Sequence, residues 1–151
     1  MAILKESQII GNYTVQSFIK KGLYNETYRI SDKEGAPYFL KIFDPTRIPY
    51  DIKDKDGQIL EITLYRKLAH RNVIQYVNDD IYEMSNTKYP YIVTQYFTGI
   101  LVAEPLVSGR IFPLERALNI TINALKGLIY MHSKGLLHND ITPRNIMFNP
   151  K

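Results

Sequence analysis

The sequence predicts an α+β fold, in which a block of antiparallel β-strands with one helix among them precedes a long helix. Residues 13–43 carry short runs of Tyr, Val, Ile, Thr and Phe separated by turn residues, which is typical of strands. The apolar period changes to three and four residues over 54–69 and again over 113–134, which is typical of amphipathic helices. Strands and helices do not alternate along the chain, and this order argues against a parallel sheet.

The first third of the chain predicts an antiparallel meander. Its strands are expected at 13–18, 26–31 and 38–43. Turn residues separate them, at Lys20-Lys21-Gly22 and over 31–35. A fourth, buried strand is expected at 91–97, where the run YIVTQYF is ended by Thr98-Gly99.

Two segments predict amphipathic helices. In the first, over 54–69, the apolar stripe consists of Ile59, Leu60, Leu64 and Leu68. The longer helix is expected to begin at Pro113, because a first-turn residue needs no N–H, and to end before Gly135. Its stripe consists of Leu114, Ala117, Leu118, Ile122, Leu125, Leu128 and Ile129. Two short strands, 136–137 and 146–148, are expected on either side of the polar turn that follows.

Composition and charge exclude several classes of protein. The chain has 151 residues, of which 45% are hydrophobic and 23% charged, as in a globular domain with its own core. It has no Cys, which excludes disulfide scaffolds, thiol catalysis and Cys-based zinc sites. The net charge of +4 is spread along the chain, so no nucleic-acid partner is expected. No apolar run is long enough to span a membrane and no secretory signal is recognised, so a cytoplasmic protein without a membrane partner is expected.

The polar turn after the long helix holds the residues best suited to chemistry. It reads His138-Asn139-Asp140-Ile141-Thr142-Pro143-Arg144-Asn145. A carboxylate such as that of Asp140 can accept the proton of a hydroxyl, and an amide oxygen such as that of Asn145 can bind a divalent cation. Asp before Ile-Thr-Pro also favours a plain turn, so the turn alone does not establish a site.

With the residues before it, this turn resembles the catalytic loop of the protein kinase superfamily, H-x-D-[IL]-x-P-x-N. Upstream, Tyr38-Phe39-Leu40-Lys41 takes the place of the family's V-A-I-K strand. Glu61 begins the pattern E-x-x-L-x-x-x-L-x-H-x-N-V of the family's N-lobe helix. The resemblance extends from about Tyr13 to Phe148 and implies a kinase N-lobe over 1–98, followed by part of a helical C-lobe over 99–151.

The resemblance implies an enzyme that transfers a phosphoryl group from ATP, with Mg²⁺, to a protein hydroxyl, of serine/threonine type rather than tyrosine type. It implies that Asp140 positions the hydroxyl and that Asn145 binds Mg²⁺. Lys41 would hold the phosphates while paired with Glu61. The other ATP-binding residues that the resemblance implies are Ile19, Gly22, Thr27, Thr94, Gln95, Tyr96 and Phe97.

The chain also departs from the family pattern. Its glycine-rich loop keeps only the middle glycine, Gly22, and has Lys20 in place of the first. Phe39 stands where the family has alanine, so a tighter nucleotide pocket is expected, and Asn139 replaces the arginine of H-R-D. These departures leave open a small-molecule phosphotransferase of the same fold, and a pseudokinase or docking module.

The family's D-F-G segment lies beyond the position of Asn145, after which the sequence continues only from 146 to 151. We therefore expect a catalytic-domain fragment, truncated after the catalytic loop and inactive alone. The 113–134 helix would lack its usual cover, so this fragment is also expected to self-associate through that helix.

Overall fold

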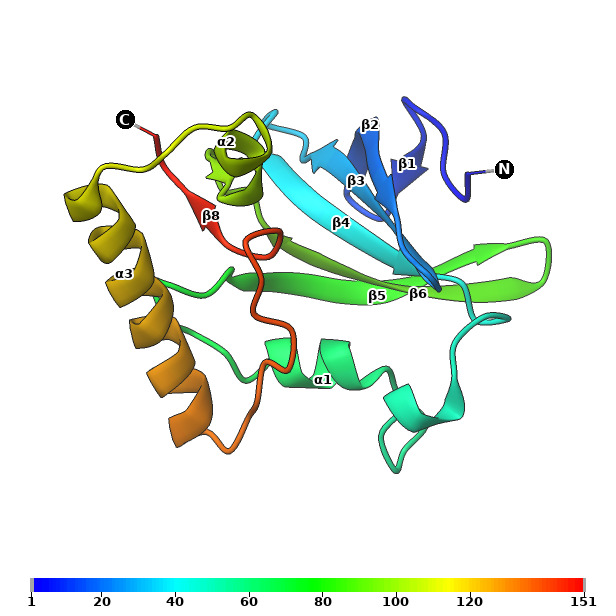
Figure 1. Cartoon of the computed structure of the whole chain (residues 1–151). Coiled ribbons are helices and arrows are strands. Elements are labelled where there is room, and N and C mark those ends of the chain that lie inside the picture. The colour runs from blue at the N-terminus through cyan, green and yellow to red at the C-terminus, as the bar shows by residue number, and fades with distance from the viewer. Residues whose placement is uncertain (1, 151) are drawn as a thin grey trace. The chain divides into compact units, whose positions relative to one another are not determined.

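The computed structural model of the chain describes residues 2–150, which fall into two structural units. The first unit consists of Met1–Leu68 and Gln75–Tyr96, and the second of Ala69–Ile74 and Phe97–Lys151. Each unit has its own secondary structure, labelled in Figure 1. No helix among the described residues is both long enough and apolar enough to span a bilayer.

A six-stranded antiparallel sheet makes up most of the first unit (Figure 1). The strands lie in the order β1-β2-β3-β4-β6-β5. They are β1 (Ile9–Ile10), β2 (Tyr13–Lys21), β3 (Asn25–Ser31), β4 (Pro37–Phe43), β5 (Tyr76–Met84) and β6 (Thr87–Gln95). The expected meander is therefore present as β2-β3-β4, and the hairpin of β5 and β6 extends the sheet from β4.

Alternation along β4 assigns its side chains to the two faces of the sheet. Leu40 and Ile42 are fully buried on one face, so Phe39 and Lys41 belong to the other. The first face carries the larger apolar cluster, which consists of Leu4, Ile10, Tyr13, Val15, Tyr28, Ile30, Leu40, Ile42, Tyr91 and Val93. A smaller cluster consists of Phe43, Ile59, Ile62 and Ile92 and packs the helix after β4 against the face that carries Lys41.

That helix, α1 (Leu60–Tyr65), is much shorter than the predicted 54–69. Gly57 has a φ of 76°, a left-handed conformation that favours glycine and interrupts a helix. The Asp54 carboxylate accepts two backbone N–H groups of the same turn, at 3.0 and 2.9 Å. The helical spacing of apolar residues therefore continues through a segment that is a turn in the structure. A short 3₁₀ helix, η1 (Tyr50–Ile52), precedes this turn.

The second unit is built on α3 (Leu114–Ser133), with a short helix and a two-stranded sheet (Figure 1). Pro113 is the N-cap of α3, so the helix begins one residue later than predicted. Gly135 follows its end with a φ of 72°, as expected for the residue after a C-cap. The other elements are α2 (Ala103–Val107), β7 (Ile100–Leu101) and β8 (Met147–Phe148).

The strand predicted at 136–137 is wrong, because the backbone there completes the end of α3. Gly135 and Leu136 donate their N–H groups to the carbonyls of His132 and Met131, at 2.9 and 3.0 Å. These two bonds cap the helix and leave the segment outside a sheet. The second predicted strand does form as β8, although its partner is β7.

Candidate active site

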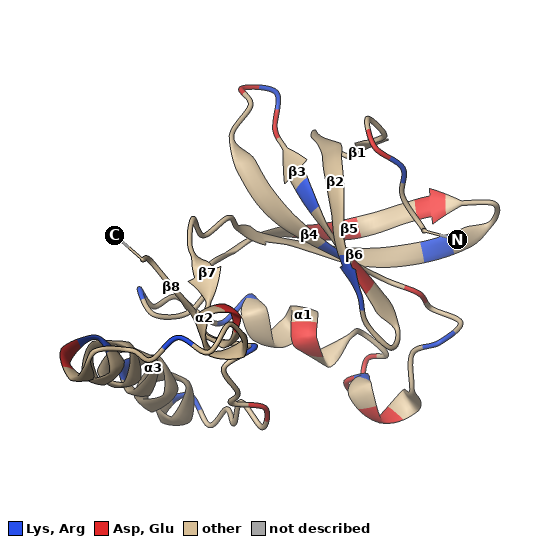
Figure 2. Ribbon diagram, turned by 45° about the horizontal axis from the view of Figure 1, so that its top comes forward, with Lys and Arg blue, Asp and Glu red and all other residues tan. Residues whose placement is uncertain are grey.

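An ion pair joins β4 to α1 in the first unit. Lys41 Nζ lies 2.7 Å from Glu61 Oε1 and 2.9 Å from Oε2. The side chains of Lys41 and Glu61 are 30% and 32% exposed, so the pair is accessible to a ligand. Figure 2 shows the basic and acidic segments of β4 and α1. The contact expected from the strand and helix placement of these residues is therefore confirmed.

Three of the residues expected at the nucleotide, Ile19, Gly22 and Thr27, lie on the β2–β3 hairpin. Thr27 is opposite Lys41 in the β3–β4 register, and Lys20, next to Ile19, is opposite Thr27 in the β2–β3 register. Gly22 lies in the connecting turn, where its N–H donates to the Asn25 carbonyl at 2.8 Å. A Cβ on Gly22 would lie 2.8 Å from the Asn25 side-chain oxygen, so the turn has little room for a larger residue.

Phe39 occupies the same face of β4 as Lys41 and belongs to an aromatic cluster. Its ring centroid lies 4.7 Å from that of Tyr96, with an interplanar angle of 42°. The Arg29 guanidinium lies 5.0 Å from the centroid of the Tyr96 ring. Thr94 is opposite Phe39 in the β4–β6 register. No sequence pattern singles out Arg29, because its place opposite Phe39 depends on the β3–β4 register.

The buried strand expected at 91–97 is shifted toward the N-terminus. It is β6, which begins at Thr87 and ends at Gln95. Tyr38 and Gln95 form the last β4–β6 pair, and the preceding Pro37 has no N–H with which to extend the ladder. Tyr96 therefore lies beyond the strand, and Phe97 belongs to the second unit.

The polar turn of the second unit brings Asp140 and Asn145 together. Asn145 Nδ2 donates to Asp140 Oδ2 at 2.7 Å and to the Asp140 carbonyl at 3.0 Å. Asn139 has a φ of 60°, a conformation that Asn tolerates better than most residues. His138 Nδ1 accepts the Asp140 N–H at 3.3 Å. Through this bond His138 supports the conformation of the turn.

The turn that holds Asp140 and Asn145 also offers side-chain oxygen atoms to a magnesium ion. No group of three or more His, Asp or Glu side chains is placed to hold a metal within residues 2–150. Mg²⁺ usually takes only one or two protein oxygens and completes its shell with phosphate and water. The amide oxygen of Asn145 and the carboxylate of Asp140 fit that partial role.

Comparisons with known proteins agree with one another. A family model described as the protein kinase domain matches residues 13–151. The chain is 32% identical over 148 residues to serine/threonine-protein kinase STK11 of Rattus norvegicus and to that of Homo sapiens, covering 95% of this chain and 33% of each relative. It is 26% identical over 152 residues to calcium-dependent protein kinase 4 of Plasmodium falciparum, covering 98% of this chain and 28% of that protein.

A solved structure is similar along the whole chain. The crystal structure of the Mycobacterium tuberculosis PknI kinase domain matches with a TM-score of 0.74 and 22% identity, covering 100% of this chain and 60% of that one. At 22% identity, this similarity supports a shared fold and nothing further. The chain spans about a third of the length of the two curated STK11 kinases.

Proposed function

Because this chain belongs to the protein kinase domain family, we propose that it takes part in phosphoryl transfer from ATP to a serine or threonine hydroxyl of a protein. The α+β fold that the sequence predicts is that of the solved kinase domain. The observation that carries the proposal is the bidentate pair of Lys41 and Glu61. A lysine fixed in this way is the group that protein kinases use to hold the phosphates of ATP.

In this proposal, Lys41 binds the phosphates. An ammonium group has three N–H donors, and the two Glu61 oxygens account for two of them. The third donor is available to a phosphate oxygen, and Glu61 holds the ammonium in place while it binds. The other nucleotide contacts that we propose are Ile19, Gly22 and Thr27 beside the phosphates, and Thr94, Gln95, Tyr96 and Phe97 beside the adenine.

Asp140 positions the acceptor hydroxyl in this proposal. The Asn145 amide occupies Oδ2 of Asp140, and no hydrogen bond to Oδ1 is formed among residues 2–150. Oδ1 can therefore accept the proton of a serine or threonine hydroxyl. The Asn145 amide oxygen would bind Mg²⁺, which neutralises charge on the phosphates when bound.

A transfer assay with labelled ATP and Mg²⁺ tests this function on the protein purified from its own cells, at whatever length it has there. A panel of serine- and threonine-containing peptides is expected to be labelled, and Asp140→Asn is expected to abolish the labelling. Labelling of aminoglycosides, choline or sugars in place of peptides would establish the small-molecule phosphotransferase instead.

A docking module without catalysis is the second candidate, and the aromatic cluster favours it. Phe39 packs on Tyr96 at the position where the family has alanine, and this bulk narrows the space for adenine. Thermal melting with and without MgATP separates the two candidates. A rise in the melting temperature that Lys41→Met removes supports nucleotide binding, and no rise supports the docking module.

We expect a polypeptide limited to these 151 residues to transfer no phosphate at a measurable rate. No D-F-G sequence follows Asn145 in this polypeptide, so Asn145 would hold Mg²⁺ without the Asp that kinases also use. The assay compares this polypeptide with its Asp140→Asn variant, and both should give only background. A rate that Asp140→Asn abolishes would contradict the prediction.

A further inference from the structure

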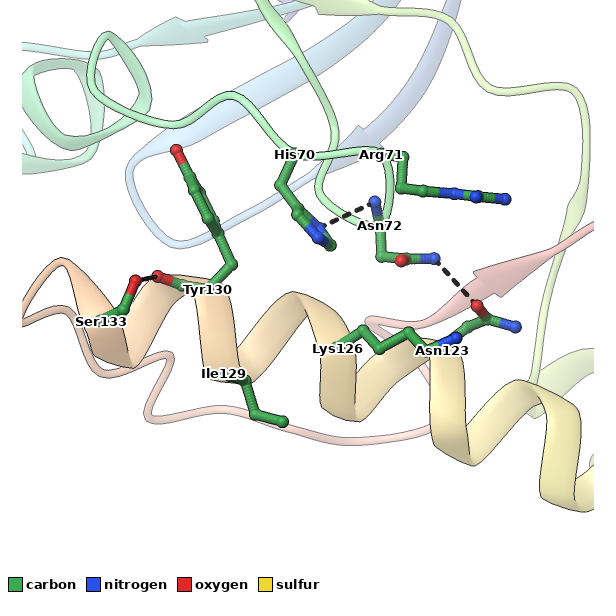
Figure 3. A pocket seen from close by; sticks show the side chains of 8 residues that line it. All are labelled: His70, Arg71, Asn72, Asn123, Lys126, Ile129, Tyr130 and Ser133. Atoms are coloured by element: carbon green, nitrogen blue, oxygen red, sulfur yellow. Dashed lines mark hydrogen bonds between the residues drawn. The ribbon is translucent and has the colours of Figure 1, made fainter.

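A pocket of about 390 Å³ lies in the second unit, where the segment 69–74 meets α3 (Figure 3). The residues that line it include two cations, two amides and an apolar wall. They are Arg71, Lys126, Asn72, Asn123, Ile129 and Tyr130. The proposed phosphoryl-transfer function uses none of these side chains.

The base of the pocket is held in place by contacts between the segment and the helix. The Tyr130 hydroxyl accepts the N–H of Ala69 at 2.9 Å. The Tyr130 ring stacks on His70, with centroids 5.0 Å apart and an interplanar angle of 17°. At Gly127, the absence of a Cβ allows the Asn72 carbonyl to approach the helix. The pocket is therefore built on a fixed frame.

The charge of the pocket is positive and uncompensated. Arg71 and Lys126 are exposed, and in the described part of the chain neither forms an ion pair or a side-chain hydrogen bond. No acidic residue lines the pocket. In the view of Figure 3 the two side chains extend in the same direction, one from the loop and one from the helix. Two such cations favour a ligand with about two negative charges.

Asn72, in the same pocket, has a hydrogen-bond acceptor without a partner in the described part of the chain. Its Oδ1 is buried and has no hydrogen-bond partner among residues 2–150. Its Nδ2 donates to Asn123 Oδ1 at the long distance of 3.4 Å. A buried acceptor without a partner favours any ligand that brings a donor. The backbone N–H of a peptide is such a donor.

We propose that this pocket binds a phosphorylated serine or threonine side chain within a peptide segment. The phosphate contacts Arg71 and Lys126, and the neighbouring hydrocarbon lies on Ile129 and Tyr130. The Asn72 amide, held at its Nδ2 only by the long bond to Asn123, turns so that its Oδ1 accepts a backbone N–H of the peptide. A phosphoserine carries a charge of about −1.5 to −2 at pH 7, which suits two cations better than the single charge of a carboxylate.

Fluorescence anisotropy of the purified protein with labelled peptide pools tests this site. The pools have random flanks around a fixed phosphoserine, glutamate or serine. We expect binding of the phosphoserine pool only, and a loss of at least about tenfold in affinity in the double variant Arg71→Gln with Lys126→Gln. The matched control is Arg110→Gln with Lys88→Gln, which removes the same charge at exposed positions outside the pocket.

Each outcome decides the proposal. Equal loss in both double variants, or no binding by the unsubstituted protein, overturns it. Binding of the glutamate pool as tight as that of the phosphoserine pool overturns the assignment to phosphate. Competition by inorganic phosphate at the concentration of the peptide would show that the free ion suffices, which overturns the peptide ligand. Shifts of the Asn72 and Asn123 side-chain amide signals on binding of the phosphoserine pool would support it.

Discussion

At the residue scale, the pairing of Lys41 with Glu61 depends on which face of β4 and which side of α1 carry these two side chains. β4 turns Lys41 away from the buried face that holds Leu40 and Ile42, and α1 presents Glu61 to the same side. Neither residue would be singled out alone, because a lysine on a strand is usually solvated. The distances of 2.7 and 2.9 Å between them make a specific pair.

Replacing Lys41 with Met should weaken ATP binding by roughly 10- to 100-fold, because a hydrogen bond to a charged group contributes about 1.5–3 kcal/mol. Isothermal titration with MgATP measures the change. Lys88→Met, at an exposed position of the β5–β6 hairpin, is the control and should bind ATP as the unsubstituted protein does. ATP affinity unchanged by Lys41→Met would remove Lys41 from the nucleotide site.

Glu26 is a residue that no motif indicates, yet it is the buried acid of the first unit, 2% exposed. Its carboxylate accepts the Ile3 N–H at 2.7 Å and the Tyr28 hydroxyl at 2.5 Å, and it pairs with Lys21 at 3.1 Å. Burial alone would raise the pKa of Glu26, but the hydrogen bonds from Ile3, Tyr28 and Lys21 outweigh it and hold this pKa below its usual value. Glu26 therefore ties the start of the chain to β3.

Because the folded-state pKa of Glu26 is depressed, its contribution to stability is present above the unfolded pKa and is lost as the pH falls through the folded one. Glu26→Gln should lower the free energy of unfolding by about 1–3 kcal/mol at neutral pH. The variant should also lose less stability than the unsubstituted protein on acidification. Urea unfolding at neutral and acidic pH measures both effects. Glu34→Gln, at an exposed turn, should change neither, and an equal pH dependence in Glu26→Gln would refute the assignment.

At the element scale, α3 has contacts on one side and an uncovered apolar face on the other. Gly127 is buried against the segment 69–74, where an added Cβ would lie 2.8 Å from the Asn72 carbonyl oxygen. Alanine at this position would gain about 1 kcal/mol of helix propensity. The added Cβ would clash with a backbone atom, and backbone moves less easily than the end of a flexible side chain. The free-energy cost of this overpacking is therefore expected to exceed the gain in helix propensity.

Gly127→Ala should therefore destabilise the protein by about 1–3 kcal/mol in total. Thr121→Ala, at an exposed position of the same helix, is the matched control. It should be neutral or slightly stabilising, since it raises helix propensity and removes only the exposed hydrogen bond from its own hydroxyl to the Ala117 carbonyl. Thermal melting of both variants measures the difference. A Gly127→Ala variant as stable as Thr121→Ala would mean that the segment moves aside at no cost.

At the scale of the whole molecule, the uncovered face of α3 governs solution behaviour. Five apolar side chains on it are about half exposed or more, namely Leu114 (75%), Leu118 (52%), Ile122 (49%), Leu125 (50%) and Ile129 (67%). Their spacing of three and four residues puts them in one stripe along the helix. A contiguous apolar stripe of this kind favours association.

We expect this polypeptide to self-associate through the stripe, and Leu118→Lys with Leu125→Lys to abolish the association. Two charges would then have to be buried in the interface. Sedimentation at several protein concentrations measures the mass. Asn119→Lys adds a charge at an exposed position of α3 outside the stripe and should leave association unchanged. A monomer at every concentration would show that the stripe does not drive association.

The sequence by itself determined the features that depend on neighbouring residues. The ends of α3 follow from Pro113 and Gly135, and the strands β2 to β4 follow from β-branched and aromatic runs between turns. Asp140 and Asn145 meet because a five-residue turn joins them. These features are local, so the helix, strand and turn propensities of a few neighbouring residues are enough to determine them.

Only the tertiary structure decided the features that depend on distant partners. The start of α1 was set by the turn at Gly57, although the apolar period continued through that turn. Arg29 joined Phe39 through the β3–β4 register and Tyr96 through the segment just after β6. The segment 69–74 joined the second unit through Tyr130 and Gly127, far along the chain. Such contacts depend on burial and hydrogen bonding between segments that sequence periodicity treats separately, and this is why they emerge only in the folded chain.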